Sequence, residues 1–276
     1  MASERYQQMF SRLQARNEGA FVPFVTLADP NIELSERIIE CLLSNGADAL
    51  ELGLPFSDPV ADGPVIQAAN IRALANGAKM RACFELLARV RSRHSELPIG
   101  LLVYCNLVHA QGVEAFYQRC AEAGVDSVLI ADLPLRERQF YQSAAQKHGV
   151  QSVFICPPDA SSELRQRVAE ASEGYVYLLS RAGVTGADTA LHLPATEAIA
   201  ELAAAKSAPP LLGFGISQPD HVKQAIKSGA AGAISGSAVV RIIAEHLDNP
   251  ERLLEHLGEF VVRMKAATLI DHEAAD

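Results

Sequence analysis

The sequence predicts an α/β fold in which eight parallel strands alternate with helices and close into a (β/α)8 barrel of the TIM type. Three observations support this prediction. The chain has 276 residues, a length at which such barrels commonly form one unit. Eight short apolar runs are separated by stretches with helical patterning. Gly124, Gly149 and Gly174 recur every 25 residues, about the length of one strand–loop–helix unit.

The expected strands are runs of β-branched and apolar residues, the pattern of strands that are buried on both faces. Several follow a glycine that ends the preceding helix in the left-handed conformation, as at Gly46, Gly124 and Gly229. The strands are expected at residues 21–27, 48–52, 99–104, 127–131, 152–156, 175–179, 210–213 and 232–235.

Helices are expected between these strands, and extra helices are expected at the N-terminus, after strand 2 and after strand 8. The helices between strands include residues 34–44, 113–123, 136–147, 162–172 and 221–228. No linker or low-complexity segment interrupts the chain, so we expect residues 1–276 to form a single domain. The polar residues 271–276 are expected to form a flexible tail.

The composition favours a small-molecule or protein partner. Apolar residues make up 49% of the chain, enough for a sizeable core, and the net charge of -9 without a basic cluster disfavours nucleic acid. No apolar run approaches the roughly 18 residues of a membrane span, and the N-terminus lacks the apolar segment of a secretion signal. Five widely spaced cysteines are typical of reduced thiols. We therefore expect a cytoplasmic protein.

The loop after the second strand carries candidate catalytic carboxyl groups. Glu51 ends that strand on the same face as Ala49 and Gly53, which are small enough to leave space in the barrel mouth. An apolar surround raises a carboxyl pKa toward the range useful for proton transfer, and Asp62 could take a complementary electrostatic role. The structural alternatives are an ion pair for Glu51 and, for Asp62, an N-cap ahead of Pro64.

Glycine-rich loops follow the seventh and eighth strands, where barrels often bind phosphate. Their sequences are Gly213-Phe214-Gly215-Ile216-Ser217 and Ser235-Gly236-Ser237. Neither contains Lys or Arg, so backbone N–H groups and the Ser237 hydroxyl would hold the anion. The structural alternative is a pair of tight turns, because G-x-G by itself is a weak signal.

The segment 180–187 after the sixth strand has the composition of a mobile lid, with polar groups between Gly183 and Gly186. A static surface loop is the alternative. The six lysines fall outside the expected strands, which disfavours a Schiff-base aldolase. The eight histidines lack metal-binding spacing, so we expect no metal ion.

Taken together, these segments resemble the α subunit of tryptophan synthase. The matching segments are residues 21–26, 51–63, 178–186, 213–217 and 235–237, in the family's order, and the resemblance covers nearly the whole chain. The departures are small: Ala28 stands where the family often has Gly, and Leu54 where Val or Ile is more usual. Neither touches the expected chemistry.

The resemblance implies a lyase of tryptophan biosynthesis that cleaves indole-3-glycerol phosphate to indole and glyceraldehyde 3-phosphate, without a cofactor. It makes Glu51 and Asp62 the catalytic carboxyl groups. By resemblance, Phe24, Leu102, Leu129, Tyr177 and Phe214 line the indole pocket, Arg181 and Thr185 belong to the lid, and Gly186, Gly215, Gly236 and Ser237 hold the phosphate. For the apolar members, plain core packing is the alternative.

The resemblance also implies a partner, a pyridoxal-phosphate β subunit in an α2β2 complex. Pro55, Phe56 and Asp58 form the expected docking segment, with Phe56 an exposed aromatic on the rim of the active site. Two other functions are weighed: another phosphate-binding barrel isomerase or synthase that shares only the phosphate loops, and a non-catalytic subunit that activates a partner. The presence of both Glu51 and Asp62 disfavours the second.

Overall fold

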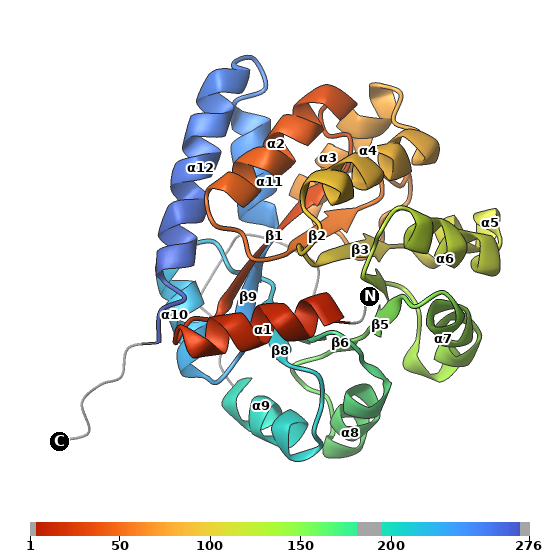
Figure 1. The fold of residues 1–276 in the computed structure, drawn as a ribbon, viewed down its shortest axis with the longest axis vertical. Helices are drawn as coiled ribbons and strands as arrows, with labels where there is room; N and C mark the ends of the chain where they lie inside the picture. The colour runs from red at the N-terminus through yellow and green to blue at the C-terminus, as the bar shows by residue number, and fades with distance from the viewer. Residues whose placement is uncertain (1–3, 181–194, 271–276) are drawn as a thin grey trace.

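The computed structural model describes residues 4–180 and 195–270. Parallel strands form one sheet, hydrogen-bonded in the order β5-β4-β3-β2-β1-β9-β8-β7-β6, with helices around it (Figure 1). The strands are β1 (Ala20–Thr26), β2 (Leu50–Gly53), β3 (Ile99–Val103), β4 (Ser127–Ile130), β5 (Gln151–Val153), β6 (Ile155–Cys156), β7 (Val176–Leu179), β8 (Pro210–Gly213) and β9 (Gly232–Ser235). Because β1 pairs with β9, the sheet curls round as a barrel does.

The two strands at the ends of this order, β5 and β6, are halves of one run. The first pairs with β4 and the second with β7, and Phe154 stands between them. The Phe154 carbonyl accepts the Tyr177 N–H at 3.1 Å. This bond continues the hydrogen bonding with β7 through the residue that separates β5 from β6. All eight predicted runs are therefore strands, and residues 4–180 and 195–270 contain nine strands because the predicted fifth strand is divided.

The helices expected between the strands are confirmed, as are the extra ones. The former are α2 (Ile32–Ser44), α6 (Val113–Glu122), α7 (Arg138–Lys147), α8 (Ser162–Ala171) and α10 (Pro219–Lys227). The extra helices are α1 (Arg5–Ala15), α3 (Pro64–Ala75) after β2, and α11 (Ser237–Glu245) and α12 (Pro250–Ala266) after β9. The other helices described are α4 (Met80–Arg93), α5 (Cys105–Gln111), α9 (Ala195–Ala204) and the 3-10 turn η2 (Leu135–Glu137). The predicted tail, 271–276, lies outside the described residues.

Two layers of apolar side chains stabilise the barrel. One fills the space between the strands and the outer helices, and the other fills the barrel interior. Tyr6, Met9 and Leu13 of α1 belong to the interior layer, so α1 covers one end of the barrel, which it crosses in Figure 1. The opposite end, where the strands finish, is left for the site. In the described ranges, no helix has both the length and the apolar character that a membrane crossing requires.

Ionic contacts gather at the end of the barrel where the strands begin. Asp126, just before β4, is buried and accepts from Arg5 and Arg91, each at 2.7 Å, and from the Ile99 N–H at 2.7 Å. Lys265 of α12 lies 2.9 Å from both Glu18 and Asp48. These contacts join both terminal helices to the beginnings of the strands, and they satisfy carboxylates that would be costly to bury alone.

Candidate active site

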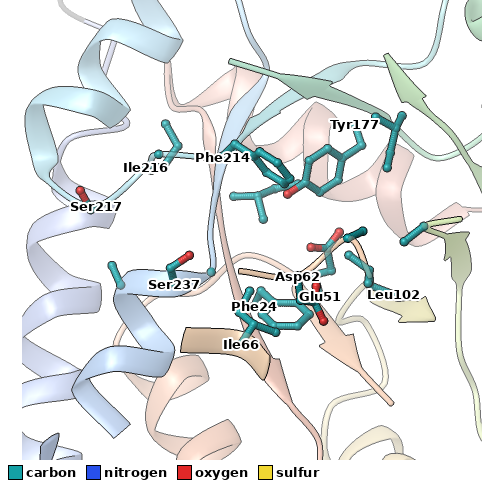
Figure 2. Close-up of a pocket in the computed structure, with 17 residues that line it drawn as sticks. Phe24, Glu51, Asp62, Ile66, Leu102, Tyr177, Phe214, Ile216, Ser217 and Ser237 are labelled. Carbon is teal, nitrogen blue, oxygen red and sulfur yellow. The ribbon is translucent and has the colours of Figure 1, made fainter. Parts of the chain in front are cut away.

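A pocket opens at the end of the barrel where the strands finish. Its lining comes from β1, β2, β3, β6, β7 and β9, from the starts of α3 and α11, and from the loops that follow several strands. The space measures about 710 Å³, counting its open mouth. The lining residues are Phe24, Glu51, Ala61, Asp62, Ile66, Leu102, Ala131, Ile155, Tyr177, Phe214, Gly215, Ile216, Ser217, Ile234, Gly236, Ser237 and Ala238. Figure 2 shows the two carboxyl groups beside Leu102 and the serines Ser217 and Ser237 toward another side of the pocket.

Glu51 stands on β2 with its side chain inside the barrel mouth. The residue is 1% exposed, and the Tyr175 hydroxyl donates to its carboxyl at 2.8 Å. Burial raises the pKa of Glu51 to about 7, because an apolar surround penalises the charged form more than the Tyr175 hydrogen bond favours it. The negative charge of Asp62 raises the pKa further. The structure gives Glu51 no cationic partner among the described residues, which removes the ion-pair alternative.

Tyr175 is a site residue that the sequence analysis missed. It lies directly before β7, and alternation places it on the same interior face as Tyr177. That pattern was visible in the sequence. What the sequence does not contain is the contact with Glu51, 124 positions away along the chain.

Asp62 lies in the loop between β2 and α3 and is 7% exposed. Burial raises the pKa of Asp62 to about 6, and hydrogen bonds from Tyr104 and Asn70 oppose this rise. The Asn70 amide lies 3.4 Å from the carboxyl. The N-cap of α3 is Gly63, so Asp62 does not serve as the helix cap that was its structural alternative. Tyr104 and Asn70 are further residues that the sequence analysis missed.

The two carboxyl groups therefore have different properties in one pocket. Near neutral pH, Asp62 is largely ionised, because its pKa is about 6, whereas Glu51 with a pKa of about 7 exchanges its proton readily. Pairs of carboxyl groups whose environments separate their pKa values are suited to distinct acid–base and electrostatic roles.

Apolar and aromatic side chains form the walls between the carboxyl groups and the serines. Phe24, Leu102, Tyr177 and Phe214 all line the pocket, as the resemblance implied. The rings of Tyr177 and Phe214 meet edge to face with centroids 6.4 Å apart. Gly53 makes room for Phe24, because a Cβ on Gly53 would lie 2.8 Å from the Phe24 ring. These walls fit a flat aromatic ligand.

Leu129 is the predicted indole-pocket residue that the structure does not bring to the pocket. It is buried in the barrel-interior layer, and the next residue on the same face of the chain, Ala131, lines the pocket instead. Side chains on one face of a strand are two residues apart, so the prediction chose the position just before the lining residue on the same face. Ile66, Ile155 and Ile234 line the pocket without having been predicted.

Backbone groups and hydroxyls form the part of the pocket after β8 and β9. Phe214 and Gly215 both have positive φ, at 66° and 74°, which turns the chain sharply after β8. The hydroxyls of Ser180 and Ser235 hold this turn by donating to the carbonyls of Phe214 and Ile216. Ser237 is the first residue of α11, with Gly236 as N-cap.

A helix N-terminus beside a glycine turn is a suitable site for a phosphate group. Of the predicted phosphate residues, Gly215, Gly236 and Ser237 come together, and no Lys or Arg is among the lining residues that the structure describes. Gly186 lies outside the described residues, as do the predicted lid residues Arg181 and Thr185.

The rim segment at 55–59 differs in one respect from the prediction. Phe56 is half-buried, because its ring stacks on Tyr104 with centroids 5.2 Å apart and its N–H donates to Asn70 at 2.9 Å. The prediction of an exposed aromatic was therefore wrong, because the Phe56 side chain is only partly exposed. Asp58 is exposed, Pro55 is half-buried, and the most exposed apolar side chain of the loop is Val60, at 73%.

The fold and the pocket are those of a (β/α)8-barrel enzyme that moves protons on a phosphorylated small molecule. Comparison with known proteins makes this specific. The model of the tryptophan synthase alpha chain family matches residues 10–269. The chain belongs to this family, whose members are lyases acting on indole-3-glycerol phosphate.

Individual relatives and solved structures agree. The tryptophan synthase alpha chain of Vibrio parahaemolyticus is 58% identical, over 96% of this chain and 98% of the relative, and that of Shewanella oneidensis is 60% identical, over 96% of each. The structure of tryptophan synthase subunit alpha from Legionella pneumophila is similar, with a TM-score of 0.84 at 32% identity, over 96% and 98% of the two chains. A chain of the tryptophan synthase α2β2 complex from Pyrococcus furiosus gives 0.81 at 33% identity, over 90% and 98%.

Gly236→Asp should weaken the binding of a phosphorylated ligand far more than it lowers stability. A Cβ at Gly236 would meet its nearest neighbour at 3.6 Å, so there is room for a side chain, while a carboxylate there would repel the anion. Calorimetric titration with glycerol phosphate checks the binding, and thermal unfolding checks the stability. Gly236→Ala is the matched control that adds the Cβ without the charge. Equal affinity in the parent and Gly236→Asp would show that the phosphate lies elsewhere.

Proposed function

We propose that this chain cleaves indole-3-glycerol phosphate to indole and glyceraldehyde 3-phosphate, with Glu51 as the acid–base group and Asp62 as the electrostatic one. The observation that carries the proposal is the buried Glu51 carboxyl, whose pKa of about 7 suits proton transfer at neutral pH. Family membership supports the substrate, and the aromatic walls of the pocket support the orientation of its ring.

Cleavage of the carbon bond requires two proton movements close together. Indole C3 must accept a proton, and the neighbouring side-chain hydroxyl must lose one, so that the carbon–carbon bond breaks and a carbonyl forms. A single carboxyl that exchanges its proton near neutral pH can serve both tasks. Glu51 meets this requirement, and its Tyr175 hydrogen bond orients the carboxyl without supplying a full charge.

Asp62 has the complementary role. Positive charge develops on the indole ring as C3 is protonated, and an ionised carboxylate near the ring N–H stabilises that charge. The lower pKa of Asp62, about 6, keeps it ionised when Glu51 is protonated. The phosphate would lie against Gly215, Gly236 and Ser237, which anchors the substrate away from the reacting atoms.

The proposal includes a partner. The relative from Pyrococcus furiosus is part of a tryptophan synthase α2β2 complex, and we propose that this chain binds a pyridoxal-phosphate β subunit in the same way, through the rim segment with Pro55, Phe56 and Asp58. A partner that consumes indole would retain a neutral product that otherwise diffuses away. The five free cysteines support a reducing, cytoplasmic location.

Glu51→Gln should reduce the cleavage rate at least about 100-fold with the fold retained, because the amide keeps the shape of the side chain but has no proton to transfer. The measurement is indole release from indole-3-glycerol phosphate by the purified chain, with circular dichroism as the check on folding. Glu85→Gln, in an exposed pair with Arg81, is the matched control and should behave as the parent. Near-parental indole release by Glu51→Gln would remove the acid–base assignment.

The same carboxyl should make stability depend on pH. The folded pKa of Glu51, about 7, lies above its ordinary value of 4.5, so the folded state binds the proton more tightly than the unfolded state does. The contribution of Glu51 to the free energy of unfolding is thus fully present below pH 4.5, and it is lost as the pH rises through 7. Between pH 5 and pH 8 the parent should lose about 2.5 kcal/mol relative to Glu51→Gln, since each pH unit between the two pKa values is worth about 1.4 kcal/mol and part of the range lies below pH 5.

Urea unfolding of both proteins at pH 5 and pH 8 measures this difference. Groups that do not interact with Glu51 contribute equally to both proteins and cancel, so subtracting the two unfolding free energies leaves Glu51 together with its electrostatic coupling to Asp62. A difference that stays constant with pH would mean that Glu51 titrates near its ordinary value.

Asp58→Ala should weaken activation by the β subunit more than it changes the cleavage rate of the isolated chain. The Asp58 side chain is exposed on the rim segment, so its loss leaves the pocket intact while it removes a contact for a docked partner. Indole release is measured with and without saturating cognate β subunit, which should raise the parent rate about tenfold or more. Equal activation of Asp58→Ala and the parent would exclude Asp58 from the docking surface.

A further inference from the structure

The glycine turn after β8 is held at three points by side chains outside it. Phe214 and Gly215 both have positive φ, and a non-glycine residue rarely keeps that conformation unless surrounding contacts impose it. Two of the contacts are the hydroxyl bonds from Ser180 and Ser235. The third comes from the helix that follows the turn, through the imidazole of His221 on α10.

His221 reaches back along the chain to the end of the turn. Its Nδ1 accepts the Ser217 N–H at 3.3 Å and lies 3.5 Å from the Ser217 hydroxyl. Because this Nδ1 accepts an N–H, it carries no proton, and the ring is the Nε2–H tautomer. His221 is the third residue of α10, the position from which a glutamate or glutamine often accepts a backbone N–H at the beginning of a helix. The contact is a variant of that helix cap, displaced by one residue, because Ser217 precedes the N-cap Gln218.

The helix that carries His221 is itself firmly placed. It begins at Pro219, whose ring fixes the backbone in a helical conformation. Val222 and Ala225 are buried in the apolar layer between the strands and the outer helices. The half-buried His221 side chain therefore offers the turn an acceptor in a fixed position.

Both polar groups of the peptide between Ile216 and Ser217 are bonded to the protein. The carbonyl accepts a serine hydroxyl at 2.7 Å, and the N–H donates to His221. The two preceding N–H groups, of Gly215 and Ile216, have no acceptor within residues 4–180 and 195–270. Ile216 and Ser217 line the pocket on the side away from the two carboxyl groups (Figure 2). The turn thus leaves two N–H donors for an anion and withholds the third.

We infer that His221 is a positioning residue for the phosphate end of the pocket, because it holds the Ser217 N–H and thereby fixes the turn that presents the Gly215 and Ile216 N–H groups. The identity of the ligand, a phosphorylated substrate, rests on the proposed function, whereas the contact is a property of this chain. An N–H without an acceptor is unfavourable, so without His221 the 216–217 peptide should rotate toward another partner and disturb the donors beside it. His221 is absent from the described lining residues, so it acts through Ser217 and not by touching the substrate.

A histidine near an anion could also act as a cation, and this role is distinct from the one inferred. The nitrogen that faces Ser217 carries no proton, so the contact in the structure is that of an acceptor. The two roles predict different results for one substitution, because asparagine can accept an N–H but is never charged.

His221→Leu and His221→Asn are the deciding pair of variants. Their side chains have the same number of heavy atoms, and the asparagine oxygen can take the place of Nδ1, whereas leucine cannot accept an N–H. In calorimetric titration with glycerol phosphate, His221→Leu should bind about fivefold more weakly than the parent, and His221→Asn should stay within about twofold of it. Thermal unfolding of each variant measures the stability separately.

The kinetics of indole release distinguish positioning from a general loss of structure. In His221→Leu, KM for indole-3-glycerol phosphate should rise about fivefold while kcat stays within about twofold of the parent, because the carboxyl groups that move protons are untouched. His148→Leu is the matched control. It also removes an imidazole, but one that contacts Glu114 between outer helices, and it should equal the parent in both constants.

Ser217→Ala shows which group of Ser217 transmits the effect, because it removes the hydroxyl and keeps the N–H. His221→Leu should weaken glycerol phosphate binding by the same factor in this background as in the parent, since the two changes act on different groups. A loss that disappears in the Ser217→Ala background would overturn the route through the N–H.

The remaining outcomes decide separate claims. Equal affinity of the parent and His221→Leu for glycerol phosphate would overturn the positioning role, and equal weakening in His221→Leu and His221→Asn would overturn the acceptor role. Failure of the parent to release indole would overturn the proposed function, while the titrations with glycerol phosphate would still decide the role of His221. A parent that binds no glycerol phosphate would overturn the anion site and this role together.

Discussion

The structure of the site depends on one costly arrangement, a carboxyl group buried in the apolar mouth of the barrel. Moving a charged carboxylate out of water is unfavourable unless the group is paired or protonated. Glu51 is held by a tyrosine hydroxyl instead of a cation, so the protonated form remains accessible and the pKa lies near 7. A lysine or arginine in the position of Tyr175 would favour the charged form and remove the proton that the chemistry needs. The aromatic walls serve the same end, since they surround the carboxyl with apolar surface.

The barrel topology explains why the remaining groups meet this carboxyl. All strands are parallel, so the loops after β1, β2, β8 and β9 emerge at one end, although they are separated by most of the chain. Because β1 pairs with β9, Phe24 on β1 lies beside the end of β9, where the helix that begins at Ser237 follows. The pocket is thereby extended, with proton-transfer groups in one part and a helix N-terminus in another. An anion held by backbone N–H groups needs no cation, and a cation near Glu51 would disturb its pKa.

Much of this arrangement was predictable from the sequence, because it follows from position along a strand. The alternation of β2 places Glu51 inward, and the glycine turns after β8 and β9 mark the proposed anion site. The residues that hold the carboxyl groups were not predictable, because Tyr175, Tyr104 and Asn70 reach them from other elements. Leu129 was expected in the pocket but lies two residues before the lining residue Ala131, since apolar alternation does not show where a strand ends. Phe56 was expected to be exposed because its stacking partner, Tyr104, lies 48 positions later in the chain.

Buried carboxyl groups have different kinds of partner at the two ends of the barrel. The partners at one end are cations that join elements of the fold, and those at the other end are neutral donors in the pocket. Where the strands begin, Asp126 is held by two guanidinium groups and Asp48 by an ammonium group. Burial raises the pKa of both carboxyl groups, and these cations oppose that rise while they join the terminal helices to the sheet. Where the strands end, Glu51 and Asp62 are held by neutral hydroxyl and amide donors. Neutral donors orient a carboxylate while they leave its charge open to change, which an ion pair does not. Burying carboxyl groups without a cationic partner lowers the stability of the fold, which the packing of the other residues must offset. The same burial raises their pKa values toward neutral pH, where they can exchange protons.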